Sequence, residues 1–245
     1  MSGLSPVLEI VGLRVRRGEG DDAFVLDVPS MCLMPGQLVA LHGPSGAGKS
    51  TLLETLAFLA PMDGLEYLSL DLGDEQVVLD APLSQRDLDA FAHLRAGPVG
   101  FVAQSGGLLP FLDARHFASA SARISGEAVD EDRLEWIVSH LEIGAEMRKG
   151  RAALSGGQRK RVALLRGLAT PRRLLLVDEP SSGLDDARAD AVLGLLMEIA
   201  RADGTAVLAA MHDTDRASAF GLETLHLRRS EGAIILASGA EGRAA

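Results

Sequence analysis

Hydrophobic and polar positions along this chain of 245 residues follow different spacings in different stretches. Near the N-terminus, residues 7–15 and 24–33 read as short strands on either side of a turn-rich, acidic stretch at 18–22. A looser alternation at 63–80, interrupted by glycines, predicts a small hairpin. These stretches together predict antiparallel β structure on the N-terminal side.

A strand, a loop and a helix are predicted next to each other within the first sixty residues or so. Residues 38–42 form a compact apolar run that ends in a glycine-rich loop. The helix after the loop is predicted by leucines that recur at helical spacing, namely Leu52, Leu53, Leu56 and Leu59. This order is typical of an α/β unit.

The pattern becomes helical in the middle of the chain and then returns to α/β. Between about residues 83 and 141 the spacing predicts helices, including one at 128–141 with its apolar side chains along one face. Residues 174–177 and 206–211 are short apolar runs of the kind that form buried parallel strands. A crossover helix is predicted between them from Val192, Leu196 and Ile199. The helical interval therefore reads as an insertion.

The elements predict a single α/β domain over residues 1–245. We expect an α/β core with a mostly parallel sheet, an antiparallel β subdomain on the N-terminal side, and an inserted α-helical subdomain. The core is assigned to residues 1–82 and 170–245, and the helical subdomain to about 83–169. A hydrophobic content of 47% is enough to bury a substantial core in a chain of this length.

Composition narrows the possible partners. A formal net charge of -10 and a pI near 5.1 argue against a broad electrostatic footprint for nucleic acid. The single cysteine, Cys32, excludes an internal disulfide. The sequence begins without the basic and apolar segments of a secretory signal, and no apolar run approaches the roughly 18 residues of a membrane span. Any membrane role is therefore expected to come through a partner.

The glycine-rich loop after residues 38–42 carries the first candidate chemistry. Its residues are Gly43, Pro44, Ser45, Gly46, Ala47, Gly48, Lys49, Ser50 and Thr51, and they satisfy the phosphate-loop pattern between a predicted strand and helix. The glycines let backbone N–H groups converge on phosphate oxygens at a helix N-terminus. We expect Lys49 to neutralise the β and γ phosphates and the Ser50 hydroxyl to ligate Mg²⁺. Kinases and GTPases share this loop, so it predicts only a nucleoside triphosphate.

Adjacent carboxylates directly follow the apolar run at 174–177. Asp178 and Glu179 would stand at the carboxyl end of a buried strand, where open α/β sheets place their ligands. Asp178 suits the coordination shell of Mg²⁺, directly or through water. Glu179 is the candidate general base that polarises the attacking water, a role worth about 10²- to 10⁴-fold in rate.

The segment Leu154-Ser155-Gly156-Gly157-Gln158 precedes a predicted helix through residue 168 and forms another helix N-terminus able to receive an anion. On this segment the chain resembles the ABC ATPases, because few other phosphate-loop proteins carry it. The resemblance implies a head-to-tail homodimer that buries two ATP molecules in its interface. In such a dimer, Ser155 and Gly157 of one copy close over the ATP held by Lys49 of the other, and Gln158 belongs to the same ATP-binding segment.

The resemblance extends over nearly the whole chain and implies further roles. Gln104 resembles the Q-loop glutamine, which contacts Mg²⁺ during catalysis and senses the membrane partner. Asp185, in the segment 182–185, resembles the D-loop aspartate at the nucleotide. His212, directly after the strand predicted at 206–211, resembles the switch histidine that contacts the γ phosphate.

The sequence departs from the family at the position expected to contact the adenine base. Many relatives carry an aromatic residue near the position of Arg17, and residues 15–18 contain none. Either Arg17 stacks its guanidinium plane on the base, or Phe24 reaches in. A basic run at 159–161 lies in the helix predicted after residues 154–158. We interpret it as the solvated face of that helix in preference to a nucleic-acid contact.

The resemblance implies a Mg²⁺-dependent ATPase that drives a transmembrane permease subunit from the cytoplasmic face of the membrane. Residues 104–110 are similar to the corresponding part of the lipoprotein-release, macrolide-export and cell-division ATPases. Leu108, Leu109 and Phe111 either contact the permease or pack between the lobes. The alternative is a soluble ABC ATPase of nucleic-acid repair or translation, whereas a phosphate-loop kinase would leave residues 154–158 unexplained.

Overall fold

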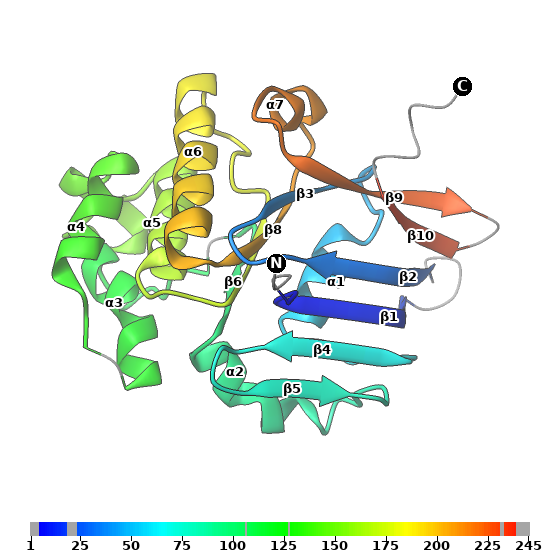
Figure 1. The fold of residues 1–245 in the computed structure, drawn as a ribbon. Coiled ribbons are helices and arrows are strands. Elements are labelled where there is room, and N and C mark those ends of the chain that lie inside the picture. Colours follow the sequence, from blue (N-terminus) through cyan, green and yellow to red (C-terminus); the bar gives the residue numbers. More distant parts are fainter. Residues whose placement is uncertain (1–4, 19–23, 106, 127, 231–232, 239–245) are drawn as a thin grey trace.

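The computed structural model describes residues 5–18, 24–105, 107–126, 128–230 and 233–238. Within them a ten-stranded sheet has the strand order β5-β4-β1-β2-β10-β9-β3-β8-β7-β6 (Figure 1). Most of the turn expected at 18–22 lies outside the described residues. The sheet and its helices give the mixed α/β fold that the sequence predicts.

One end of the sheet is antiparallel. Strands β1 (Leu8–Arg17) and β2 (Phe24–Leu33) pair antiparallel over nearly their full length. Strand β4 (Tyr67–Asp71) pairs antiparallel with β1 and with β5 (Gln76–Leu79). The antiparallel edge and the hairpin predicted from residues 7–33 and 63–80 are both confirmed.

The other end of the sheet is parallel and buried. Strands β3 (Leu38–His42), β8 (Ala206–Ala210) and β7 (Leu174–Asp178) run parallel, and every residue in them is buried. The edge strand β6 (Val99–Val102) pairs parallel with β7. The carboxyl ends of these strands lie at one edge of the sheet, and the candidate site residues follow them there.

Strands β9 (Glu223–Ser230) and β10 (Ala233–Ser238) join the two ends of the sheet. Strand β9 is parallel to β3 and antiparallel to β10, and β10 is parallel to β2. The hydrophobic pattern did not predict β9 or β6, and β6 lies within the stretch 83–141 that was predicted to be helical.

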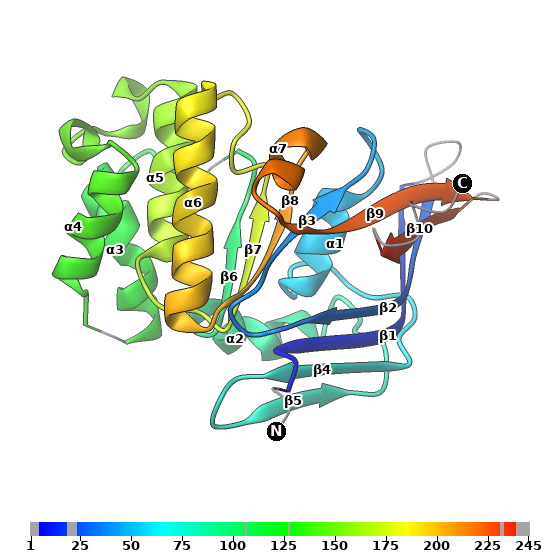
Figure 2. The same ribbon diagram turned by 45° about the horizontal axis from the view of Figure 1, so that its top comes forward.

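Helices cover both faces of the parallel strands. Helix α1 (Lys49–Leu56) lies between the parallel and the antiparallel strands, and α6 (Asp186–Asp203) packs on the opposite face of the parallel part (Figure 2). The helices between β6 and β7 are α3 (Ala114–Ser125), α4 (Glu131–His140) and α5 (Gly156–Leu168), with the 3₁₀ turns η3 (Gly144–Glu146) and η4 (Arg151–Ala153). The remaining helices are η2 (Leu88–Phe91), α2 (Ala92–Ala96) and α7 (Thr214–Ala219).

Two apolar clusters hold these layers together, and strand β7 shows how. Leu174 and Leu176 point into the cluster that includes α1 and the antiparallel strands. Leu175 and Val177 point into the cluster formed with α3, α5 and α6. Alternate residues of a strand face opposite sides, so a sheet covered on both sides needs the continuous apolar run seen here. None of the helices in the described part of the chain combines the length and apolarity needed to cross a bilayer.

Candidate functional site

A cavity of about 360 Å³ opens at the carboxyl ends of the parallel strands. Its lining comes from parts of the chain far apart in sequence: Phe24, Ser45, Gly46, Ala47, Gly48, Lys49, Ser50, Thr51, Gln104, Glu179 and His212. We call this cavity the P-loop groove. It brings most of the phosphate-loop residues together with Gln104, Glu179 and His212.

The loop between β3 and α1 is wrapped around the side chain of Lys49. Gly46 and Gly48 adopt φ angles of 74° and 78°, in the left-handed region that glycine tolerates best. The Lys49 ammonium donates to the carbonyl oxygens of Gly43 at 2.7 Å and Pro44 at 3.2 Å. Burial lowers the pKa of Lys49, while the charges of Glu179 and Asp178 act in the opposite direction. The ammonium is thus held at the mouth of a helix N-terminus that favours anions.

Ser50 and Asp178 meet beneath the groove. The Ser50 hydroxyl donates to Asp178 Oδ2 at 2.7 Å, and Asp178 is only 6% exposed. Burial raises the pKa of Asp178, against the hydrogen bond from Ser50, which lowers it. A buried carboxylate beside a hydroxyl supplies the hard oxygen donors that Mg²⁺ prefers, so these residues fit that ion. No group of three or more His, Cys, Asp or Glu side chains in the described residues has a metal-binding arrangement. In proteins Mg²⁺ is usually bound by one or two carboxylates together with substrate phosphates and water.

Glu179 is the point at which the side chains of the groove converge. Its Oε2 accepts a hydrogen bond from Gln104 Nε2 at 2.7 Å, and its Oε1 lies 2.6 Å from His212 Nε2. Its φ angle of 52° is in the left-handed region, which is uncommon for a residue other than glycine. The backbone N–H of Glu179 donates to the Ala210 carbonyl at 3.0 Å, which anchors this turn to the end of β8.

The environment of Glu179 keeps its carboxyl group ionised. Burial raises its pKa, but hydrogen bonds from His212 and Ser182 and the charges of His212 and Lys160 outweigh burial. The net result is a pKa below the ordinary value for a glutamate. An ionised carboxylate with fixed oxygens is what a general base for water requires.

The two residues considered for the adenine lie in different places. Phe24 lines the P-loop groove, and its ring stands 3.1 Å from the position that a Cβ on Gly48 would occupy. The Arg17 guanidinium instead donates to the carbonyl oxygens of Arg16 at 2.7 Å and Pro61 at 3.0 Å. Arg17 does not line the groove, so Phe24 is the better placed of the two to stack on a base.

The segment from Leu154 to Gln158, which we call the signature segment, contains the start of α5. Its residues do not line the P-loop groove. The Ser155 side chain accepts a hydrogen bond from the Gln158 N–H at 3.3 Å, and Gln158 Oε1 accepts from the Ser155 N–H at 2.8 Å. This reciprocal pair is a capping box. Ser155 and Gly156 are exposed, and Ser155, Gly157 and Gln158 do not line the groove of their own chain.

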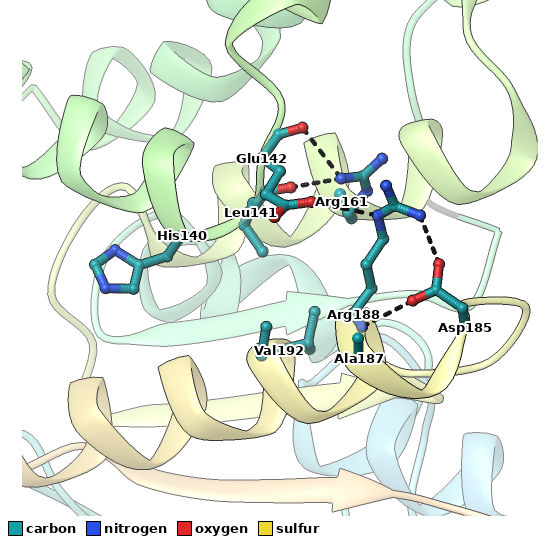
Figure 3. Close-up of a pocket in the computed structure, with 9 residues that line it drawn as sticks. His140, Leu141, Glu142, Arg161, Asp185, Ala187, Arg188 and Val192 are labelled. Carbon is teal, nitrogen blue, oxygen red and sulfur yellow. Dashed lines mark hydrogen bonds and ion pairs between the residues drawn. The ribbon is translucent and has the colours of Figure 1, made fainter.

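Asp185 caps the next helix along the chain. Its carboxylate accepts from the Arg188 N–H at 3.0 Å and from the Arg188 side chain at 2.5 Å, at the start of α6. Asp185 and Arg188 line a separate cavity of about 280 Å³. Figure 3 shows Glu142, which follows α4, and Arg161 of α5 facing them across this cavity. Arg188 Nε lies 3.4 Å from Glu142 Oε2. Asp185 is exposed and does not line the P-loop groove of its own chain.

The interpretation of the basic run as a solvated face is wrong for part of it. Arg161 is only 8% exposed, and its guanidinium donates to the carbonyls of Leu141 at 2.6 Å and Glu142 at 3.2 Å. Lys160 is half-buried and donates to the Ser182 carbonyl at 2.9 Å. Long cationic side chains bury their stems and bind carbonyls at helix ends, a use that charge patterning alone does not reveal.

The class of protein follows from this fold and groove together with the signature segment, and comparison with known sequences agrees. Residues 26–182 match the family described as ABC transporter. The chain therefore belongs to the ABC transporter family and is one of its ATP-binding, ATP-hydrolysing subunits.

Similar proteins come from several bacteria. The chain is 37% identical to the lipoprotein-releasing system ATP-binding protein LolD 2 of Caulobacter vibrioides, over 86% of this chain and 90% of that protein. It is 34% identical to the uncharacterized ABC transporter ATP-binding protein YbbA of Escherichia coli, with the same shares covered. It is 33% identical to the macrolide export ATP-binding/permease protein MacB of Marinobacter nauticus, over 96% of this chain but only 35% of that protein.

Solved structures show the same architecture. The fold resembles the ATP-binding cassette MJ0796, solved as a dimer in a post-hydrolysis state bound to ADP and Pi. The TM-score is 0.76 at 25% sequence identity, covering 90% of this chain and 94% of that one. A further dimeric structure of MJ0796 gives a TM-score of 0.74, also at 25% identity.

Proposed function

We propose that this ATPase works as a homodimer with two ATP–Mg²⁺ sites at its interface and drives a transmembrane permease subunit from the cytoplasmic face of the membrane. The observation that carries the proposal is the convergence of Gln104 and His212 on Glu179 inside a groove formed by the phosphate loop. The groove supplies the phosphate cradle and the base, but the second anion-receiving helix end, at Ser155, is exposed and does not line it.

Within one groove, each residue has a defined task. Backbone N–H groups of residues 43–51 and the Lys49 ammonium hold the phosphates. Ser50, Asp178 and Gln104 are the proposed Mg²⁺ residues, and a bound Mg²⁺ neutralises charge on the phosphates. Glu179 takes the proton of the attacking water, and His212, through Nε2, fixes the carboxylate and reaches toward the γ phosphate.

The signature segment supports the dimer. Ser155 and Gly156 are exposed at the N-terminus of α5, where the helix dipole favours an anion. A second copy in head-to-tail orientation would place this end against its own ATP, with Gly157, Gln158 and the exposed Asp185 nearby. The dimeric structures of MJ0796, a cassette of similar fold, support a dimer for this chain.

The permease contact is proposed for the segment after Gln104. Phe111 is 76% exposed and Leu109 is 42% exposed, whereas Leu108 is buried in the core. Exposed apolar side chains in the segment that follows Gln104 suit a contact with a permease subunit, through which the binding of that subunit could affect the ATP site. We assign this contact to a helical subdomain at about 83–169, carried on a core of 1–82 and 170–245. The names of LolD and MacB support export or extraction as the work performed.

The substitution Glu179→Gln tests the proposal. It preserves the shape of the side chain and removes the base, so it should leave ATP binding intact and reduce turnover by about 10²-fold or more. Slow hydrolysis should also trap an ATP-dependent dimer, visible as a shift in size-exclusion chromatography with light scattering. The exposed Glu198→Gln variant of α6 serves as the control and should behave as wild type. Unchanged hydrolysis by Glu179→Gln would exclude Glu179 as the base.

The alternative of a soluble ATPase in nucleic-acid repair or translation has less support. LolD and MacB, two of the named relatives, are a lipoprotein-releasing and a macrolide export protein by name. Copurification of a membrane protein with the chain from its own cell would favour the transport role, and retention on nucleic acid without such a protein would favour the alternative.

A further inference from the structure

Lys160 connects the signature helix to the segment that follows Glu179. Its ammonium donates to the Ser182 carbonyl at 2.9 Å and also to the Ser182 hydroxyl. Lys160 lies in the second turn of α5, just past the capping box formed by Ser155 and Gln158. The side chain is half-buried, so its charge acts in a medium less polar than water.

Ser182 continues the connection to the catalytic carboxylate. Its backbone N–H donates to the Glu179 carbonyl at 3.3 Å, which closes the turn after β7. The Ser182 side chain also acts on the Glu179 carboxyl group, whose pKa it lowers, although burial raises that pKa. Lys160 is therefore one residue removed from Glu179, although the two lie on different elements.

The same end of α5 packs directly on this segment. A Cβ on Gly157 would lie 3.3 Å from Leu184 Cδ2 and 3.7 Å from the Gly183 carbonyl oxygen. Close packing of this kind transmits displacement, because interiors have little free volume. A movement of the α5 N-terminus is therefore transmitted to the segment that contains Ser182, both through this packing and through Lys160.

We propose that Lys160 is a positioning residue that couples the two nucleotide sites of the dimer, by holding Ser182 and Glu179 of its own site in register with the signature helix that closes over the ATP of the other. The coupling rests on the dimer proposed above. When α5 is drawn onto a triphosphate at its N-terminus, Lys160 fixes the turn that carries the base. When α5 withdraws, the base loses that support.

The test compares Lys160→Met with Lys160→Arg, using Arg201→Met as a control that removes an exposed cation at the end of α6. Lys160→Met should lower kcat on the order of ten- to a hundredfold, as expected for a misplaced catalytic group, with KM for ATP within about twofold. The KM stays because Lys49 and the phosphate loop hold the nucleotide. Arg201→Met should match wild type.

Rescue by the conservative variant separates positioning from general damage to the fold. Lys160→Arg keeps a long cationic side chain that can donate to the Ser182 carbonyl and hydroxyl oxygens, so it should recover most of the wild-type kcat. Thermal unfolding followed by circular dichroism should give Lys160→Met a Tm within a few degrees of that of Arg201→Met.

A wild-type kcat in Lys160→Met would overturn the coupling. So would a kcat that is lowered equally in Lys160→Met and Lys160→Arg, because the cation held against Ser182 would then have no part in the effect. A failure of the dimer proposal gives a different result, since the Glu179→Gln variant with Lys160 intact would then form no ATP-dependent dimer. The coupling and the dimer can thus fail separately.

Discussion

Ser50 and Asp178 are 128 positions apart in the sequence, yet the Ser50 hydroxyl donates to Asp178 Oδ2 over 2.7 Å. The contact joins the first turn of α1 to the end of β7 and sets the floor of the P-loop groove. The carboxylate is buried there, and burial raises its pKa. A group whose acid form is favoured by folding makes the folded state less stable once the pH rises above its unfolded pKa.

Asp178→Asn should therefore separate stability from function. At pH 7 and without nucleotide, the neutral isostere should raise the Tm by a few degrees, and the gain should shrink as the pH falls toward 4. Affinity for Mg²⁺ should weaken by at least about 10-fold. Thermal unfolding followed by circular dichroism and a Mg²⁺ titration of ATPase activity measure the two effects. A lower Tm at pH 7 would contradict this account of the buried carboxylate.

Ser155 can be tested as a helix cap and as an ATP contact in separate variants. Ser155→Ala removes the cap and should cost about 1 kcal/mol of stability. Ser155→Asp keeps a good cap but places a negative charge against the triphosphate of the partner site. Ser155→Asp should therefore unfold like wild type in urea and yet lose the ATP-dependent dimer in the Glu179→Gln background. Retention of that dimer would remove Ser155 from the interface.

His212 lowers the pKa of Glu179 through a hydrogen bond and its charge, although burial acts against it. A carboxylate with a depressed pKa stays ionised, and so active as a base, down to lower pH. In His212→Gln the loss of charge should shift the acid limb of kcat to higher pH and reduce kcat by about 10²-fold. His93→Gln, at an exposed position, is the control and should follow the wild-type profile. An unmoved acid limb would mean that His212 does not tune the base.

Phe24 and Arg17 make opposite predictions for nucleotide affinity. Phe24→Ala should weaken ATP binding by about tenfold, since stacking on a base is worth about 1–3 kcal/mol. Arg17→Ala should leave ATP affinity unchanged, because the guanidinium is bound to the Arg16 and Pro61 carbonyls. Fluorescence titration with a labelled ATP analogue measures both. Loss of affinity in Arg17→Ala alone would reverse the assignment.

The sequence predicted the elements whose apolar pattern is long or continuous and missed those whose pattern is broken. Strand β6 contains Gly100, which reads as an interruption. In the structure a Cβ there would lie 2.8 Å from Leu175 Cδ1, so glycine is what permits the close packing of this strand. Strand β9 alternates leucines with charged and polar residues, and its place between β3 and β10 depends on partners elsewhere in the chain.

The candidate site shows the same division. The phosphate loop and the residues at strand ends could be placed together, because parallel strands end at the same edge of a sheet. The contact between Lys160 and Ser182 could not, since it depends on the angle at which α5 approaches the turn after β7. Lys160 was therefore interpreted as surface charge from the sequence, whereas in the structure it is half-buried and hydrogen-bonded to Ser182.

Lys49 rests on the carbonyls of its own loop, and this has a consequence for the affinity of the site. An incoming triphosphate must exchange these internal contacts for its own, so the measured affinity is the difference between two sets of hydrogen bonds. A loop with an internal partner for its cation gives up spent nucleotide more readily than one that would be left with a bare charge. Such a subunit is suited to repeated turnover, in which the release of product nucleotide is as necessary as the binding of ATP.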